Sequence, residues 1–158
     1  MTYPCIMIDI VDYPDLSLNK ELRSWIDFLP HETYEFTNLA VEKHTGYNTY
    51  PKPFIKLKDW VVEKLELDSD KIEYQLWGAV YNHGDFAYEH RHGKNDYSFV
   101  YYVSTPPGSS PLNFDGYIVQ PHEGMCVIFQ DELHSVPENQ CDGRVVVAGN
   151  LRYSDTDL

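Results

Sequence analysis

Three histidines have the spacing of a metal site. His90 and His92 are separated by one residue, and His134 comes much later, shortly after an apolar run at 125–130. Side chains two positions apart on a strand point to the same face, so His90 and His92 can converge on one point. In a barrel of two sheets, His134 can face them across the interior. Three imidazoles leave positions open on a divalent metal, which is typical of a catalytic site.

The order of motifs around these histidines is more specific than the histidines alone. An Asn82-His83-Gly84-Asp85 turn comes before His90, a β-type run follows at 98–103, and a Leu112-Asn113-Phe114 run comes next. Later come Gly124, an apolar run at 127–129 and a His134-Ser135-Val136-Pro137 segment. Arg144 stands ten residues after His134, at the start of a β-branched run.

This series, over about residues 72–153, resembles the iron(II)/2-oxoglutarate-dependent oxygenases, especially the prolyl-4-hydroxylase-like branch, which includes small members encoded by phages. By position, the resemblance implies that His90 and His134 bind iron and that Arg144 holds the distal carboxylate of 2-oxoglutarate. It also implies that Tyr102 and Ser98 place hydroxyls near that carboxylate, and that Tyr81 lines the cosubstrate pocket. The reaction implied is hydroxylation, in which decarboxylation of 2-oxoglutarate is coupled to C–H oxidation of a substrate that the sequence does not identify.

The chain departs from the family pattern at the third metal ligand. The family has Asp or Glu where this chain has His92, and a neutral imidazole leaves the metal more positive by one charge. Either three histidines bind the metal, or His92 is a bystander and water or a nearby carboxylate completes the site. Glu89 points to the opposite face, and Asp96 reaches back only if the intervening loop folds inward. We favour His92 as the ligand because of its spacing from His90.

The pattern of elements predicts a mainly β fold with helices at the N-terminus (α+β). Residues 1–70 carry a short edge strand at 6–11, then helical stripes over 18–29 and 53–67, separated by a loop at 41–53. Residues 71–153 show many short β-type runs between turn signals. The pattern therefore predicts one domain over 1–158, in which a β-sandwich or barrel at 71–153 is buttressed by the helical region 1–70. The resemblance implies that this core is a double-stranded β-helix, a cupin-like jelly roll.

Composition excludes several classes of protein. The 158 residues carry a formal net charge of −13 without a basic cluster, which argues against nucleic acid as a partner. No apolar run is long enough to span a membrane, and the first ten residues do not look like a signal peptide. Three widely spaced cysteines indicate reduced thiols and a cytoplasmic location. A small-molecule or peptide substrate is compatible with this surface, and the oligomeric state stays open.

Two alternatives remain at this point. A three-histidine, cupin-type iron dioxygenase would need His90, His92 and His134 but neither 2-oxoglutarate nor Arg144. A non-enzymatic β-sandwich binding module would carry the histidines incidentally or around a structural metal. In that case Arg144 would be an ordinary surface residue after the Asp142-Gly143 turn.

Overall fold

The protein was analysed as a computed structural model that describes residues 7–93 and 96–154. Cys5 and Ile6, the first residue of the predicted edge strand, lie outside the described residues. The edge strand itself is β1, at Ile8–Asp12. No helix in the described ranges is long and apolar enough to cross a membrane.

The strands form two sheets, and every pairing between named strands is antiparallel. The larger sheet has the order β1-β9-β6-β11-β4-β3. Besides β1, it contains β3 (Lys43–His44), β4 (Ile72–Tyr81), β6 (Asp96–Ser104), β9 (Met125–Gln130) and β11 (Arg144–Tyr153).

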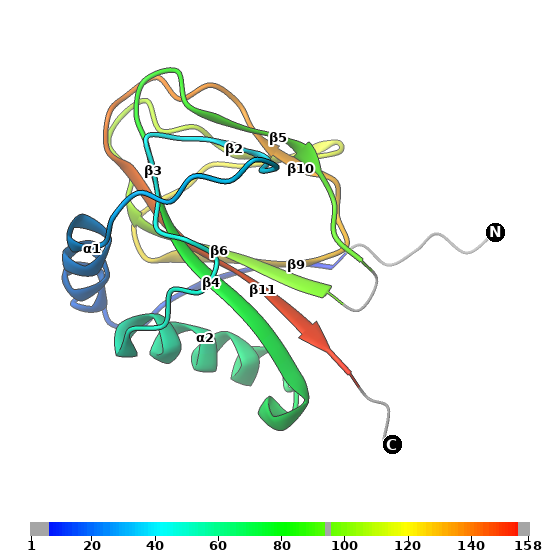
Figure 1. Ribbon diagram of the computed structural model, residues 1–158. Coiled ribbons are helices and arrows are strands. Elements are labelled where there is room, and N and C mark those ends of the chain that lie inside the picture. The colour runs from blue at the N-terminus through cyan, green and yellow to red at the C-terminus, as the bar shows by residue number, and fades with distance from the viewer. Residues whose placement is uncertain (1–6, 94–95, 155–158) are drawn as a thin grey trace.

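The smaller sheet has the order β2-β5-β10-β7-β8. Its strands are β2 (Leu39–Ala40), β5 (Phe86–His90), β7 (Leu112–Phe114), β8 (Tyr117–Val119) and β10 (His134–Val136). In Figure 1, β5 and β10 lie across from β4, β6 and β11, so the two sheets face each other. The strand pattern predicts such a two-sheet core, and its jelly-roll form is the one that the family resemblance implies.

Two helices cover the outer face of the larger sheet (Figure 1). They are α1 (Leu18–Phe28) and α2 (Lys52–Lys64), and a short 3-10 helix at Ser69–Lys71 leads into β4. The predicted apolar stripes are buried, as Leu22, Ile26 and Leu57 show. Trp25 is the exception, because it is 38% exposed and packs edge-on against Phe28.

Residues 1–70 supply strands as well as helices. Part of the segment 41–53, which the sequence predicts as a loop, forms β3 and extends the larger sheet. Just before it, β2 pairs with β5 in the smaller sheet. Each of these strands has only two residues, which is too short to show the alternation by which strands are recognised. Both sheets therefore have an edge strand from the N-terminal region.

Gly149 marks the tightest packing in the larger sheet. A Cβ atom at this position would overlap the Phe99 ring and lie 2.9 Å from Cδ2 of Leu76. We predict that Gly149→Ala lowers the free energy of unfolding by about 1–3 kcal/mol, because an added methyl group in a close-packed core forces its neighbours apart. Urea denaturation measures this. Gln75→Ala, on the exposed end of β4, is the control and should change the value by under about 0.5 kcal/mol. Equal effects would contradict the close packing.

Candidate metal centre and its cavity

The three histidines come together between the sheets. Each of His90, His92 and His134 offers one nitrogen, and these atoms all lie within 4.8 Å of one another. His90 ends β5 and pairs directly with His134 at the start of β10. His92 lies beyond the end of β5, so it reaches the cluster from the following segment and not from a shared strand face, as its spacing suggested. The three histidines converge as the sequence predicts, but His92 joins them from the segment after β5 and not from the strand itself.

Backbone carbonyls orient two of these imidazoles. Nδ1 of His90 lies 2.6 Å from the carbonyl oxygen of Tyr88, and Nδ1 of His134 lies 2.7 Å from that of Glu132. A carbonyl only accepts hydrogen bonds, so Nδ1–H is the donor in each case. The lone pair of each neutral ring is then on Nε2. Metal-binding histidines typically donate their other ring N–H to a carbonyl or carboxylate in this way, which fixes the orientation of the ring.

The buried histidines of the cluster are neutral at physiological pH. Burial, together with the neighbouring His90, lowers the pKa of His134 to about 3. Burial and His90 also lower the pKa of His92. A metal therefore does not have to displace protons from these two rings, which favours metal binding near neutral pH.

No carboxylate joins the cluster within residues 7–93 and 96–154. Asp96, one alternative that the sequence left open, makes two hydrogen bonds to the Arg152 guanidinium at 2.9 and 3.3 Å and accepts the Gly93 N–H. Glu89 is exposed. Of the residues considered for the third position, His92 is the one that lies beside His90 and His134.

The cluster opens onto a cavity between the sheets. The cavity has a volume of about 690 Å³, which includes the part open to solvent. Its walls are mostly apolar and contain Trp77, Leu112, Phe129 and Val146. None of the described residues that line it is Asp or Glu, and its one permanently charged side chain is Arg144. A cavity with this lining favours an anionic ligand.

Arg144 lies at the deep end of the cavity and is 1% exposed. Its Nε donates to the carbonyl of Ser110 at 3.0 Å, and its guanidinium lies over the rings of Tyr81 and Tyr102 at 4.5 and 5.3 Å. The two terminal nitrogens have no hydrogen-bond partner in the described part of the chain. A buried, unpaired charge is costly. The two terminal nitrogens can therefore pair with an anion that has two acceptor oxygens, such as a carboxylate.

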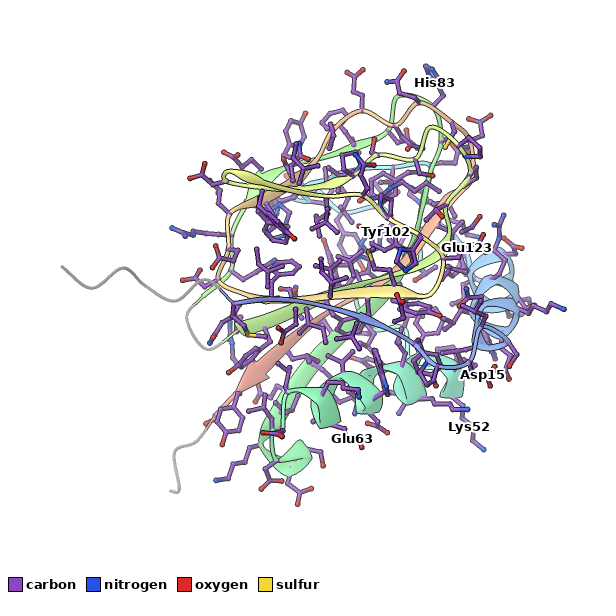
Figure 2. All side chains as sticks on the ribbon, turned by 180° about the vertical axis from the view of Figure 1, so that it is seen from behind. Asp15, Lys52, Glu63, His83, Tyr102 and Glu123 are labelled. Atoms are coloured by element: carbon purple, nitrogen blue, oxygen red, sulfur yellow. The ribbon has the colours of Figure 1, made fainter. Side chains whose placement is uncertain are left out.

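Tyr102 supplies a further donor beside Arg144. Its ring lies in the interior between the sheets (Figure 2), and its hydroxyl is buried without a partner in the described residues. Burial raises the pKa of Tyr102 to about 12, and burial also raises the pKa of Tyr81. Both phenols stay protonated at neutral pH. The deep end thus gathers a cation and neutral donors around one point.

Ser98 does not lie with Tyr102 and Arg144. Its backbone pairs with Asn150, and its hydroxyl donates to Oδ1 of that residue at 3.0 Å. Asn150 is six positions beyond Arg144 on β11, which corresponds to roughly 20 Å along a strand. Ser98 and Tyr102 share a strand face, as predicted, but they lie four residues apart along β6, beside different residues of β11. Ser98 and Arg144 line the same cavity at different heights, and the role of Ser98 at the distal carboxylate stays a prediction.

One residue that builds the deep end, Asn139, has no signal in the sequence. Asn139 is fully buried, and its amide donates to the carbonyls of Tyr81 and Cys141 at 3.0 and 2.7 Å. Its Oδ1 accepts the N–H of Ser110 at 2.9 Å. Asn139 thus connects the end of β4 to the segment whose carbonyl holds Arg144. An isolated Asn in a polar segment gives no hint of this role.

Solved structures with the same fold are found among prolyl hydroxylases and 2-oxoglutarate/iron(II) oxygenases. A viral collagen prolyl hydroxylase, vCPH, from Paramecium bursaria Chlorella virus-1 in complex with 2-oxoglutarate has a TM-score of 0.74 at 15% identity, covering 94% of this chain and 96% of that one. A Pseudomonas putida prolyl-4-hydroxylase has a TM-score of 0.66 at 17% identity, covering 93% and 92%.

HygX from Streptomyces hygroscopicus, with nickel and 2-oxoglutarate bound, has a TM-score of 0.69 at 11% identity, covering 94% of this chain and 83% of that one. No protein-family model and no curated protein sequence matches the chain. At these identities the similarity establishes the fold. It confirms the jelly roll predicted from the sequence, and the resemblance to this group of proteins at the level of fold.

We predict that His90→Ala and His134→Ala each abolish binding of Fe(II) or Co(II) at micromolar concentrations and leave the fold intact, because each variant removes one of three converging nitrogens. Calorimetry, with the visible spectrum of bound Co(II), measures the loss. His83→Ala and His122→Ala remove histidines outside the cluster and should bind metal as the wild type does. Stoichiometric metal in either cluster variant would show that the histidines are not ligands.

Proposed function

We propose that the protein is an iron(II)- and 2-oxoglutarate-dependent oxygenase, a hydroxylase that couples decarboxylation of 2-oxoglutarate to C–H oxidation of a substrate. The observation that carries the proposal is the buried guanidinium of Arg144, whose terminal nitrogens have no partner among the described residues. It lies in a cavity that no described Asp or Glu lines and that also holds three converging imidazoles. A ligand that satisfies both ends must bind a metal through one end and present a carboxylate at the other. 2-Oxoglutarate has this form.

The residues present fit both groups. His90, His92 and His134 would hold iron, and three protein ligands leave positions for the 1-carboxylate and 2-keto oxygens of 2-oxoglutarate and for dioxygen. Bound iron supplies the activation of dioxygen, and 2-oxoglutarate leaves as succinate and carbon dioxide. The protein contributes orientation, electrostatics and exclusion of water.

At the deep end, Arg144 would pair with the 5-carboxylate through its two unpartnered nitrogens. The hydroxyl of Tyr102 adds a donor, and the Tyr81 ring holds the guanidinium plane from one side. Apolar walls between this end and the metal exclude water and strengthen the pairing. These contacts fix the cosubstrate in one direction, with its keto acid end toward the histidines.

A second candidate function has one observation in its favour. The three histidines form a neutral set without a carboxylate in the described residues, as in a three-histidine iron dioxygenase that does not use 2-oxoglutarate. That function does not explain Arg144, although burying its charge is energetically costly. A purely structural metal is disfavoured because three ligands beside a cavity leave the site open, whereas structural zinc sites have four protein ligands.

The composition of the chain is compatible with a small molecule or a peptide as substrate. The net charge of −13 disfavours nucleic acid. The free thiols of Cys126 and Cys141 are in keeping with a reducing, cytoplasmic location.

We predict that Arg144→Ala weakens binding of 2-oxoglutarate to the iron-loaded protein by roughly two to three orders of magnitude, because deleting one partner of a buried ion pair costs about 3–5 kcal/mol. Iron binding should stay the same, and Arg144→Lys should recover only part of the loss, because an ammonium lacks the bidentate fork. Arg152→Ala, an exposed arginine outside the cavity, is the control. A change under about threefold for Arg144→Ala would favour the second candidate function.

We predict that His92→Asp keeps iron binding and tightens it, because a carboxylate in place of a neutral imidazole adds a negative charge next to the metal. Calorimetric titration with Fe(II) under anaerobic conditions measures the affinity. His83→Asp makes the same change in charge at a distant histidine and should have no effect. If His92→Asp leaves the affinity unchanged as well, His92 is a bystander.

A further inference from the structure

The face of the larger sheet that lines the cavity carries its side chains in layers, and these layers continue beyond the cavity. In the register of β11 with β4 and β6, Arg144 pairs with Tyr81 at the deep end. Asn150 pairs with Gln75 and Ser98, and Arg152 pairs with Glu73 and Asp96. Successive layers on one face are about 7 Å apart, because side chains alternate along a strand. This face of the sheet therefore runs from one cation at the deep end of the cavity to a polar layer at Asn150 and then to a charged layer outside the cavity, which we call the mouth.

The polar layer lies beside the metal centre. Asn150 and His92 line the metal cavity and also a second, polar pocket of about 750 Å³, a volume that includes its open part. The second pocket contains Gln75, Glu73 and the Asp96–Arg152 pair. A substrate that reaches the metal through this pocket passes the charged layer first and Asn150 last.

The amide of Asn150 is held in one orientation. The buried hydroxyl of Ser98 donates to its Oδ1 at 3.0 Å, which leaves Nδ2 as the group that can donate to a ligand. Gln75 occupies the same layer on β4 and can donate or accept. The layer next to the metal thus offers hydrogen bonds to an uncharged acceptor, such as a carbonyl or a hydroxyl group.

The charged layer has a net negative charge. Asp96 and Arg152 neutralise each other through two hydrogen bonds. Glu73 lies across from Arg152 in register and takes part in no ion pair among the described residues. No ion pair among the described residues therefore neutralises the carboxylate of Glu73. An anion is repelled from this mouth and a cation is attracted to it, the opposite of the preference at the deep end.

We propose that the substrate is a polar amine: it places an uncharged acceptor against Asn150 and an ammonium or guanidinium group against Glu73, one layer farther from the metal. The inference rests on the proposed function, since it takes the metal as the place of reaction. The deep end of the cavity and the mouth then separate two ligands by charge, with the dianionic cosubstrate at Arg144 and the cationic substrate at Glu73. Ser98 is a positioning residue that fixes the Asn150 amide.

Three matched probes test this inference without turnover. N-acetyl-lysine N-methylamide, the norleucine analogue and the glutamate analogue share two amide carbonyls and differ in the charge at the end of the side chain. Each is titrated into protein loaded with Co(II) and 2-oxoglutarate, and the paramagnetic broadening of its proton resonances reports both affinity and proximity to the metal. We expect the lysine probe to bind roughly two- to fivefold more tightly than the norleucine probe, as for an exposed ion pair, and the glutamate probe most weakly.

Charge reversal at the mouth provides the decisive comparison. Glu73→Lys should invert the order of the lysine and glutamate probes. Glu35→Lys makes the same change in net charge at a neighbouring surface pocket and should leave the order as it is. Asn150→Ala should weaken all three probes and keep their order, because it removes a contact to the group that they share.

Equal binding of the lysine and norleucine probes, or equal effects of Glu73→Lys and Glu35→Lys, would overturn the inference. The failure of the proposed function is distinguishable from this result. If the histidines bind no Co(II), or if 2-oxoglutarate does not perturb the Co(II) spectrum, the proposed function fails. If both bind and the probes show no preference for positive charge, only the substrate class is wrong.

Discussion

The buried guanidinium of Arg144 is the constraint on which the rest of the cavity depends. A permanent charge that is 1% exposed and has two unpartnered nitrogens cannot be explained by packing, because an apolar side chain of similar volume would avoid the cost of desolvation. Much of the nearby structure holds this group in place. The Ser110 carbonyl accepts from Nε, Asn139 fixes the Ser110 segment, and the guanidinium carbon lies over the Tyr81 ring. The described residues thus prepare a site for an anion, and none of them supplies that anion.

The metal centre complements this arrangement. Its three imidazoles carry no negative charge, and burial keeps His134 and His92 neutral. A divalent metal with these ligands keeps its full positive charge, so a dianionic ligand that spans from the metal to Arg144 is attracted at both ends. Farther from Arg144, the polar layer at Asn150 and the negative layer at Glu73 favour neutral or cationic ligands over anions. The charge order along one face of a single sheet thus assigns different ligands to its two ends.

Spacing and alternation in the sequence were sufficient to predict a β-sandwich or barrel, the helical stripes and the convergence of His90 with His134, and the family resemblance implied the jelly roll. These features depend on local periodicity and on the order of motifs, which can be recognised even where sequence identity to related folds is low. Other features depend on register. Ser98 was placed on the correct face, but its distance from Arg144 follows from pairing with Asn150, which no local pattern reveals. The two-residue strands β2 and β3 and the bonds of Asn139 arise from tertiary contacts alone, and for that reason they could not be predicted.

The central claim is that one ligand bridges the histidine cluster and Arg144, and an anaerobic titration tests it most directly. The protein is loaded with Fe(II) and then titrated with 2-oxoglutarate, while the visible absorption spectrum is recorded. Chelation of iron by a 2-keto acid should produce a metal-to-ligand charge-transfer band that requires both components and saturates at one equivalent of each. Tight binding of Fe(II) without such a band at saturating 2-oxoglutarate would contradict the claim and leave the three-histidine dioxygenase as the better account.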